Sequence, residues 1–227
     1  WQPILKNLPI GSKKQIVTYN FRLRESRPYL EGENRKNILV CKNTFILDNF
    51  TKYFFLALSD EYTNSKSQNI KPDYWFFFVG DVPQSVLSWV DENCREEVGI
   101  LLRKATRESH ADLIKRLEET PIAGFVHLEE IPACPNAVIE AQQFGIPVIG
   151  AAGGSMSELC YFKELLIDST SDYHVFRILL FEAFRISSQT SVVHRKVMAA
   201  WAQREFGIEN AARYMCFLKK IAEGRNK

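Results

Sequence analysis

Residues 122–154 read IAGFVHLEEIPACPNAVIEAQQFGIPVIGAAGG. The stretch opens with an apolar run that ends at Leu128, and it closes with a second run at Pro147–Gly150. Between them, Val138–Ala141 fit a helix. Short continuous apolar runs are typical of strands that are buried on both faces. The stretch therefore predicts a strand, a helix and a strand of a parallel sheet.

The same alternation continues on both sides of this stretch. We expect further strands at 38–41, 74–79, 98–102 and 165–167. We expect helices at 48–58, 84–94, 110–119, 172–185, 192–205 and 209–222, and a polar loop at 61–71. This pattern predicts an α/β fold, a Rossmann-like doubly wound parallel sheet with C-terminal helices.

Changes in local composition divide the chain into three parts. Residues 1–36 are polar and basic, and they predict a linker or the remnant of a preceding domain, with a basic surface for a partner as the alternative. Residues 37–185 predict the Rossmann-like domain, and residues 186–227 predict C-terminal helices that pack on it. Because the chain begins with Trp1 instead of Met, we expect it to be a piece of a longer protein.

The composition excludes several classes of protein. Of the 227 residues, 46% are hydrophobic and 25% are charged, which supplies a sizeable core and excludes a disordered chain. The net charge of +2 is too small for a general nucleic-acid binder. No apolar run approaches the roughly 18 residues of a membrane helix, and no secretory signal opens the chain. We therefore expect a cytoplasmic protein, with peripheral membrane association left open.

The cysteines and histidines lack the spacing of a metal or disulfide site. The five Cys are scattered, without a C-x-x-C pair, and the four His have no ligand spacing. This favours a reducing compartment and predicts no metal. No G-x-G-x-x-G follows the first expected strand, and no P-loop motif is present, which argues against dinucleotide oxidoreductases and P-loop phosphotransferases. Residues that follow the strands then become the informative ones, because parallel sheets bind ligands there.

Residues 125–158 resemble the donor-binding segment of the retaining family 4 glycosyltransferases, which have the GT-B fold. The matching motifs of this segment are P-N-x-x-x-E-A at Pro135–Ala141, G-x-P-V-I at Gly145–Ile149, and G-G-x-x-E at Gly153–Glu158. Two further matches, in the same order along the chain, are Phe78–Asp81 and Arg204–Ala212. The resemblance covers about residues 37–222 and implies the C-terminal, nucleotide-sugar-binding half of such an enzyme.

The resemblance implies a role for each matching residue. The start of the helix at Asn136 and Ala137 would offer backbone N–H groups to a diphosphate, as helix N-termini do for anions. Glu140 would accept the ribose hydroxyls, and Gly153 and Gly154 would form the donor loop. The backbone near Arg103 would read the nucleobase. The two expected catalytic residues are Lys42, which would neutralise the leaving diphosphate, and Glu130, which would approach the transferred sugar.

Each of these residues also has a plainer interpretation. Glu140 could be a solvated helix residue, Lys42 a surface lysine, and the two glycines an ordinary turn. His127 lies at a strand end, where either packing or contact with the donor sugar fits.

The sequence also departs from the family pattern. Pro132 stands eight residues before Glu140, where the family has its first acid, so Glu129 or Glu130 would have to reach in from a shifted loop. No basic residue occupies 47–49, where a second phosphate-binding Lys is expected, and Lys52 is the nearest substitute. These departures leave room for weak or lost catalysis.

Three functions remain after these observations. The first is a glycosyltransferase donor domain that binds a nucleotide-diphosphate sugar and transfers the sugar with retention to a glycan or lipid-linked acceptor, as in polysaccharide biosynthesis. It would need an acceptor-binding domain in the same or another chain, and no cofactor. The second is a non-catalytic nucleotide-sugar-binding or scaffolding module of a multidomain protein. The third is a nucleotide-sugar epimerase of related fold.

Overall fold

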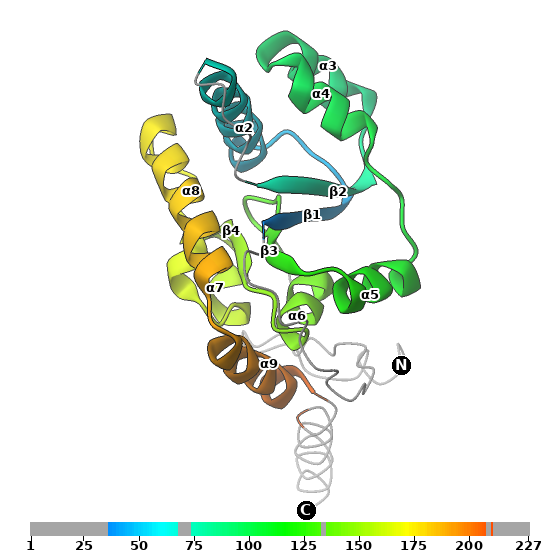
Figure 1. The fold of residues 1–227 in the computed structure, drawn as a ribbon, viewed down its shortest axis with the longest axis vertical. Coiled ribbons are helices and arrows are strands. Elements are labelled where there is room, and N and C mark those ends of the chain that lie inside the picture. Colours follow the sequence, from blue (N-terminus) through cyan, green and yellow to red (C-terminus); the bar gives the residue numbers. More distant parts are fainter. Residues whose placement is uncertain (1–35, 68–73, 133–134, 208–209, 211–227) are drawn as a thin grey trace, which may run out of the picture. The chain divides into compact units, whose positions relative to one another are not determined.

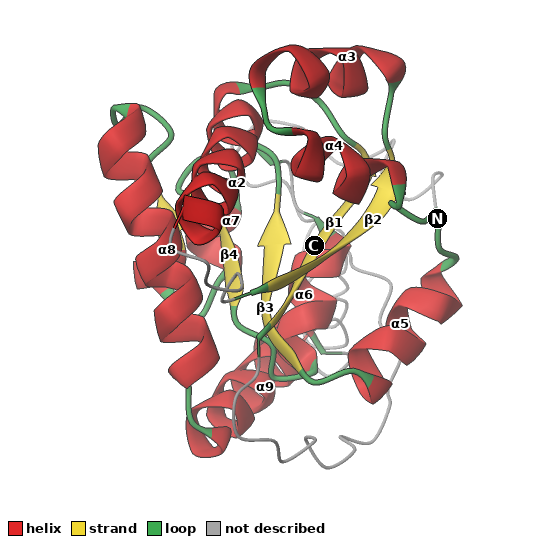
Figure 2. Ribbon diagram, turned by 45° about the horizontal axis from the view of Figure 1, so that its top comes forward, coloured by secondary structure: helices red, strands yellow, loops and turns green. Residues whose placement is uncertain are grey.

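The computed structural model describes residues 36–67, 74–132, 135–207 and 210. Its centre is a five-stranded sheet in the order β2-β1-β3-β4-β5, and all of its strand pairs are parallel (Figure 2). The strands are β1 (Asn37–Thr44), β2 (Trp75–Asp81), β3 (Ile122–His127), β4 (Val148–Ala151) and β5 (Leu166–Ile167). The expectation of an α/β fold with a Rossmann-like parallel sheet is confirmed.

Helices cover both faces of this sheet. They are α2 (Asn49–Ser67), α3 (Gln84–Asn93), α4 (Glu96–Arg103), α5 (His110–Glu119), α6 (Asn136–Gln143), α7 (Met156–Leu159), the 3-10 helix η1 (Lys163–Leu165), α8 (Tyr173–Gln189) and α9 (Val192–Phe206). Helices α2 and α8 lie on one side of the sheet, and α5 and α6 lie on the other (Figure 1). No helix of the described residues is both long and apolar enough to span a membrane.

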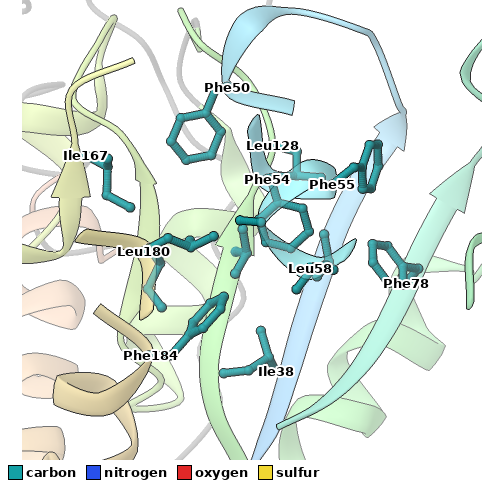
Figure 3. Packing of buried hydrophobic residues seen from close by; sticks show 14 of the residues in the cluster. Ile38, Phe50, Phe54, Phe55, Leu58, Phe78, Leu128, Ile167, Leu180 and Phe184 are labelled. Carbon is teal, nitrogen blue, oxygen red and sulfur yellow. The ribbon is translucent and has the colours of Figure 1, made fainter. Parts of the chain in front are cut away.

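The larger apolar core lies between the sheet and the α2–α8 pair (Figure 3). Phe50 and Phe54 of α2 are fully buried. The ring of Phe50 meets that of Phe176 of α8 edge-on at 5.2 Å between centroids, and Phe54 lies 6.4 Å from Phe78 of β2. Each fully buried Phe contributes about 1.5–3 kcal/mol, so this row of aromatic rings fixes α2 on the sheet. The N-terminus of α2 is thereby held at the carboxyl end of β1.

A buried arginine closes the amino end of β3. Arg195 of α9 is 1% exposed, and its guanidinium donates to backbone carbonyls from three other parts of the described chain. The acceptors are the carbonyls of Ile122, Ala123, Gly145, Ser187 and Thr190, at 2.6–3.3 Å. Since a guanidinium offers five donors in a rigid fork, one side chain satisfies the ends of α8, of β3 and of the α6–β4 turn.

The strand expected at 98–102 is wrong, because these residues lie in helix α4. The run Val98–Leu102 is apolar throughout, and short runs of this kind fit a strand and a buried helix equally well. Burial follows the helical spacing: Val98, Gly99 and Leu102 are buried, whereas Ile100 is exposed. Glu96 and Glu97 in the first turn and Arg103 in the last suit the helix dipole.

The place of that strand at the sheet edge is taken by a single residue, Thr106. It pairs with Val79 of β2 in a parallel bridge. The N–H of Gly80 donates to its carbonyl at 2.9 Å, and its own N–H donates to the carbonyl of Phe78 at 3.1 Å. The segment after α4 therefore reaches the carboxyl edge of the sheet at Thr106.

Other expected boundaries differ from the structure. The polar loop expected at 61–71 is wrong in its first part, since α2 continues to Ser67. The expected domain boundary between residues 185 and 186 falls inside α8. Apart from Lys36, the linker of residues 1–36 lies outside the described residues, as does nearly all of the helix expected at 209–222.

Candidate functional site

The strand order places a candidate site at the carboxyl ends of β1 and β3. The chain passes from β1 to β2 in one direction across the sheet and then to β3 on the other side of β1. At such a switch point the two following loops diverge and leave room for a ligand. Asp48 joins these two loops: its Oδ1 accepts from the N–H of Thr51 at 2.8 Å, and its Oδ2 accepts from the N–H of Glu130 at 2.8 Å.

Three ionisable side chains meet at this edge. Lys42 Nζ, at the end of β1, lies 2.9 Å from Glu129 Oε2. His127 Nε2, at the end of β3, lies 3.2 Å from the same oxygen. The Lys42 side chain is 11% exposed and that of His127 is 6% exposed. Lys42 is therefore a largely buried cation, and the interpretation of it as a surface lysine is wrong.

The environment of His127 favours its neutral form. Burial is the main cause that lowers the pKa of His127 from its ordinary value of 6.5, and the nearby Lys42 charge acts in the same direction. The hydrogen bond and charge of Glu129 and the backbone of Cys41 oppose this shift. Groups that favour the charged imidazole and groups that disfavour it therefore both surround the ring, and burial has the largest effect.

Glu130 lies at the N-terminus of α2. Its carboxylate accepts from the hydroxyl of Ser169 at 2.9 Å and from the backbone N–H of Asn49 at 3.4 Å. A carboxylate at a helix N-terminus is stabilised by the dipole and by unpaired N–H groups. In the described structure Glu130 is thus bound by protein donors, on the loop where the sequence predicted an acid near the transferred sugar.

Helix α6 begins at Asn136 and presents Glu140 one turn later. Asn136 is exposed, and the N-cap residue Pro135 makes no side-chain capping bond. Ala137 is half-buried in the first turn. The Glu140 side chain is only 18% exposed, and its Oε1 lies 2.7 Å from Nε2 of His110, so Glu140 is not a solvated helix residue.

The charge of Glu140 reaches the thiol of Cys41 in β1. Burial raises the pKa of Cys41 to about 12, and the negative charges of Glu108 and Glu140 add to the shift. Cys41 directly precedes Lys42 in β1. The α6 carboxylate therefore acts on the carboxyl half of β1, where the expected phosphate-binding lysine stands.

The turn at Gly153–Gly154 lies against the loop that follows β3. A Cβ on Gly153 would stand 2.3 Å from the carbonyl oxygen of Glu130, and one on Gly154 would stand 2.4 Å from that of Pro132. Gly154 also has φ of +57°, in the left-handed region. Ser155 donates to the Pro132 carbonyl through both its N–H and its hydroxyl. These glycines therefore hold the Glu130–Pro132 backbone in place.

Arg103 does not follow a strand, contrary to the prediction from the sequence. It ends helix α4 instead of following a strand, and its guanidinium binds Asp91 of α3 at 2.5 Å. The backbone that reaches the sheet edge is that of Thr106, four residues before His110. The residues best placed to line the edge here are those between Thr106 and His110.

Sequence reasoning missed Asp48, His110 and Ser169. Asp48 directly precedes an apolar helical pattern and is a preferred N-cap type. Ser109 and Asp112 flank His110 with the spacing of a helix start, and Ser109 does cap α5. Ser169 follows the last expected strand by two residues, where the rule for parallel sheets points. Among the described residues, no group of three or more His, Cys, Asp or Glu is arranged to hold a metal ion.

Comparison with known proteins bears on the fold. No protein-family model and no curated protein matches the chain. Among solved structures, the pneumococcal O-GlcNAc transferase GtfA in complex with UDP and GlcNAc superposes with a TM-score of 0.57 at 13% identity, over 87% of this chain and 38% of its own. Anabaena HepE in complex with UDP gives 0.55 at 15% identity, over 82% and 49%.

A mutant of S. aureus TarM, in complex with UDP, fondaparinux and alpha-GlcNAc-glycerol, gives a TM-score of 0.55 at 13% identity, over 96% of this chain and 41% of its own. This chain spans less than half of each of the three structures. Identities this low support a shared fold. The described part of the chain has the Rossmann-like α/β fold of GT-B glycosyltransferase domains.

Proposed function

We propose that this chain is the donor-binding half of a GT-B glycosyltransferase and binds a nucleotide-diphosphate sugar. The observation that carries the proposal is that Lys42 lies near the carboxyl end of β1, while the charge of Glu140, on the helix that follows β3, acts on the neighbouring Cys41. Lys42 supplies a buried cation there, and Glu140 supplies a mostly buried carboxylate that acts on the same strand. Solved structures of similar fold contain UDP, and one contains UDP-glucose.

The chemistry of a nucleotide sugar suits these groups. The uncapped start of α6, at Asn136 and Ala137, offers backbone N–H groups and a positive dipole end to the diphosphate. The carboxylate of Glu140 accepts hydrogen bonds from the ribose hydroxyls. The backbone of residues 106–109, in place of that near Arg103, would meet the nucleobase. The turn at Gly153 and Gly154 supports the loop that faces the sugar.

Sugar transfer would rest on electrostatic stabilisation. As the bond to the sugar breaks, negative charge grows on the leaving diphosphate, and Lys42 and the α6 amides stabilise that charge. We propose transfer with retention to a glycan or lipid-linked acceptor, in a cleft shared with an acceptor-binding domain. The reaction so described uses no cofactor. It belongs to polysaccharide biosynthesis on the cytoplasmic side, at or near a membrane.

A specific observation favours a second candidate, a non-catalytic nucleotide-sugar-binding module. The chain's own carboxylates occupy two anion-binding groups of the site: Glu129 binds Lys42, and Glu130 binds the N–H of Asn49. Pro132 also stands where the family resemblance implies an acid. A protein that only senses nucleotide sugars could keep this arrangement.

Thermal unfolding in the presence of UDP-, GDP-, ADP- and dTDP-sugars tests the proposal. A ligand at about 100 times its Kd stabilises the folded state by about 2.7 kcal/mol, which raises Tm by several degrees. Glu140→Ala should remove that shift, while Glu119→Ala, an exposed change on α5, should keep it. No shift with any of the four donors, at concentrations up to millimolar, would count against donor binding altogether.

Product analysis then separates the two candidates. A protein that contains this chain and an acceptor-binding domain should hydrolyse or transfer the sugar of the donor that binds. Tight donor binding without any release of nucleoside diphosphate would favour the non-catalytic module. Release of an isomerised nucleotide sugar, with no acceptor present, would identify an epimerase.

A further inference from the structure

The contact between Lys42 and Glu129 has an unusual feature. Lys42 Nζ is buried and, despite lying 2.9 Å from Glu129 Oε2, makes no hydrogen bond within the described residues. A buried ammonium has three donors, and leaving them unused is costly. The Lys42 charge is therefore balanced by a single carboxylate in a geometry that leaves its donors available to a better acceptor.

His127 shares that carboxylate oxygen. Its Nε2 lies 3.2 Å from Glu129 Oε2, and its Nδ1 is buried without a well-aligned partner. When Nε2 carries the proton and donates to Glu129, Nδ1 of the neutral ring is left as a buried acceptor. A second proton on Nδ1 would give Glu129 a full counter-charge from the ring. The Lys42 charge and burial oppose that second proton, whereas Glu129 favours it.

We propose that Glu129 is a positioning residue that holds the Lys42 ammonium at the phosphate position in the empty protein and yields it to a bound diphosphate, while His127 takes up a proton and replaces Lys42 as the counter-charge of Glu129. This inference rests on the proposed function. One proton passes from bulk water to the imidazole as Lys42 changes partner, and no covalent bond is made or broken.

The charges explain the direction of the exchange. A diphosphate carries more negative charge than one carboxylate and offers several acceptor oxygens, so it competes well for a flexible lysine whose donors are unused. Once Lys42 has turned away, the pair of Glu129 and the imidazole is left, in which the ring is buried and the carboxylate is 30% exposed. An opposite charge nearby favours the ionised ring, and the lysine charge that opposed it has moved.

Two charges act on His127: that of Glu129 favours the protonated ring, and that of Lys42 opposes it. Nearby, the charges of Glu108 and Glu140 act on the thiol of Cys41, and Glu130 accepts from Ser169 and from the N–H of Asn49. Among the described residues, Lys42 is the cation that acts on the ring, which is why its movement matters.

Calorimetric titration with UDP, in two buffers of different ionisation heat, measures the proton directly. For the wild-type chain near neutral pH, we expect uptake of about half a proton or more per UDP bound, since the ring passes from mostly neutral to mostly charged. Glu129→Gln should bind UDP about three- to tenfold more tightly, because the competing carboxylate is gone, and it should take up no proton. His127→Gln should bind UDP without uptake.

Inorganic pyrophosphate serves as a second probe. Pyrophosphate lacks the ribose, so it cannot displace His110 from Glu140. Proton uptake on pyrophosphate binding therefore cannot be caused by a change in the His110–Glu140 pair. We expect pyrophosphate to cause the same uptake as UDP. Glu119→Gln, on the exposed face of α5, should match the wild type in both titrations.

The outcomes separate this inference from the function on which it rests. If UDP binds to the wild type without uptake, or if uptake persists in both Glu129→Gln and His127→Gln, the exchange is overturned and donor binding stands. If neither UDP nor pyrophosphate binds to any variant, the proposed function fails, and the exchange fails with it. Should Glu129→Gln not fold, the loss or persistence of uptake in His127→Gln decides alone.

Discussion

Glu140 Oε1 lies 2.7 Å from His110 Nε2, and this contact joins the second turn of α6 to the start of α5. It fixes the carboxylate at the sheet edge before any ligand arrives. A carboxylate held in this way is preorganised to accept a diol, because little side-chain freedom is lost on binding.

The ribose can be tested at Glu140. We expect the wild type to bind UDP more tightly than 2′-deoxy-UDP, and Glu140→Gln to lower UDP affinity about ten- to hundredfold, since a hydrogen bond to a charged group contributes about 1.5–3 kcal/mol. The variant should also lose most of its preference for the ribonucleotide. Fluorescence or calorimetric titration measures both affinities, with Glu119→Gln as the matched control. Equal affinity of the wild type for the two nucleotides would contradict a ribose role.

The turn after β4 can be tested at Gly154. Gly154→Ala should destabilise the fold by about 1–3 kcal/mol, because the residue has φ of +57° and a Cβ would stand 2.4 Å from the Pro132 carbonyl. Gly99→Ala in α4 is the matched control, since its Cβ meets side-chain atoms of Arg103 and Asp91, and we expect a change within about 1 kcal/mol. Urea unfolding measures both. Similar midpoints for the two variants would show that the turn relaxes freely.

The buried guanidinium can be tested at Arg195. Arg195→Lys keeps the charge but loses most of the hydrogen bonds to five carbonyls, so we expect a loss of about 2–4 kcal/mol in the free energy of unfolding. Arg204→Lys, on the exposed face of the same helix, should change it by less than about 0.5 kcal/mol. An Arg195→Lys variant as stable as the control would mean that an ammonium satisfies these carbonyls equally well.

The state of His127 predicts how stability depends on pH in the absence of ligand. Burial holds its pKa below the unfolded value of 6.5, so at pH values below 6.5 the unfolded chain binds more protons. The contribution of His127 is therefore fully present above 6.5 and is lost as the pH falls toward the folded pKa. Between about pH 8 and pH 5, the wild type should lose more stability than His127→Gln. Parallel curves for the two proteins would contradict a lowered pKa.

Apolar periodicity was enough to predict the fold class and all five strands of the sheet. Runs such as Ile38–Cys41 and Ile122–Leu128 are short and continuous, and the structure has strands at both. The same criterion failed at Val98–Leu102, where the charges at the two ends of α4 carried the better signal. It also ended α2 too early, because the polar residues that extend it to Ser67 give no apolar pattern.

Only part of the candidate site could be predicted from the sequence, and the reason differs from that for the fold. Lys42 and Glu140 could be found because each follows a local pattern, a strand end or a helix start. The contacts of Asp48 with Glu130, and of Ser169 with Glu130, join residues separated by 82 and 39 positions. Such contacts depend on how loops meet in the folded chain, which no local pattern in a single sequence encodes.

The buried Arg195 has a consequence for how short this domain can be made. A chain cut after α8 would keep every strand of the sheet, yet the main-chain oxygens of Ile122 and Gly145 would lose the buried donor that Arg195 supplies. Unpaired buried oxygens of this kind are among the costlier defects a protein can carry. The smallest autonomous version of this Rossmann-like fold must therefore extend through α9, although α9 contributes no strand and no residue to the candidate site.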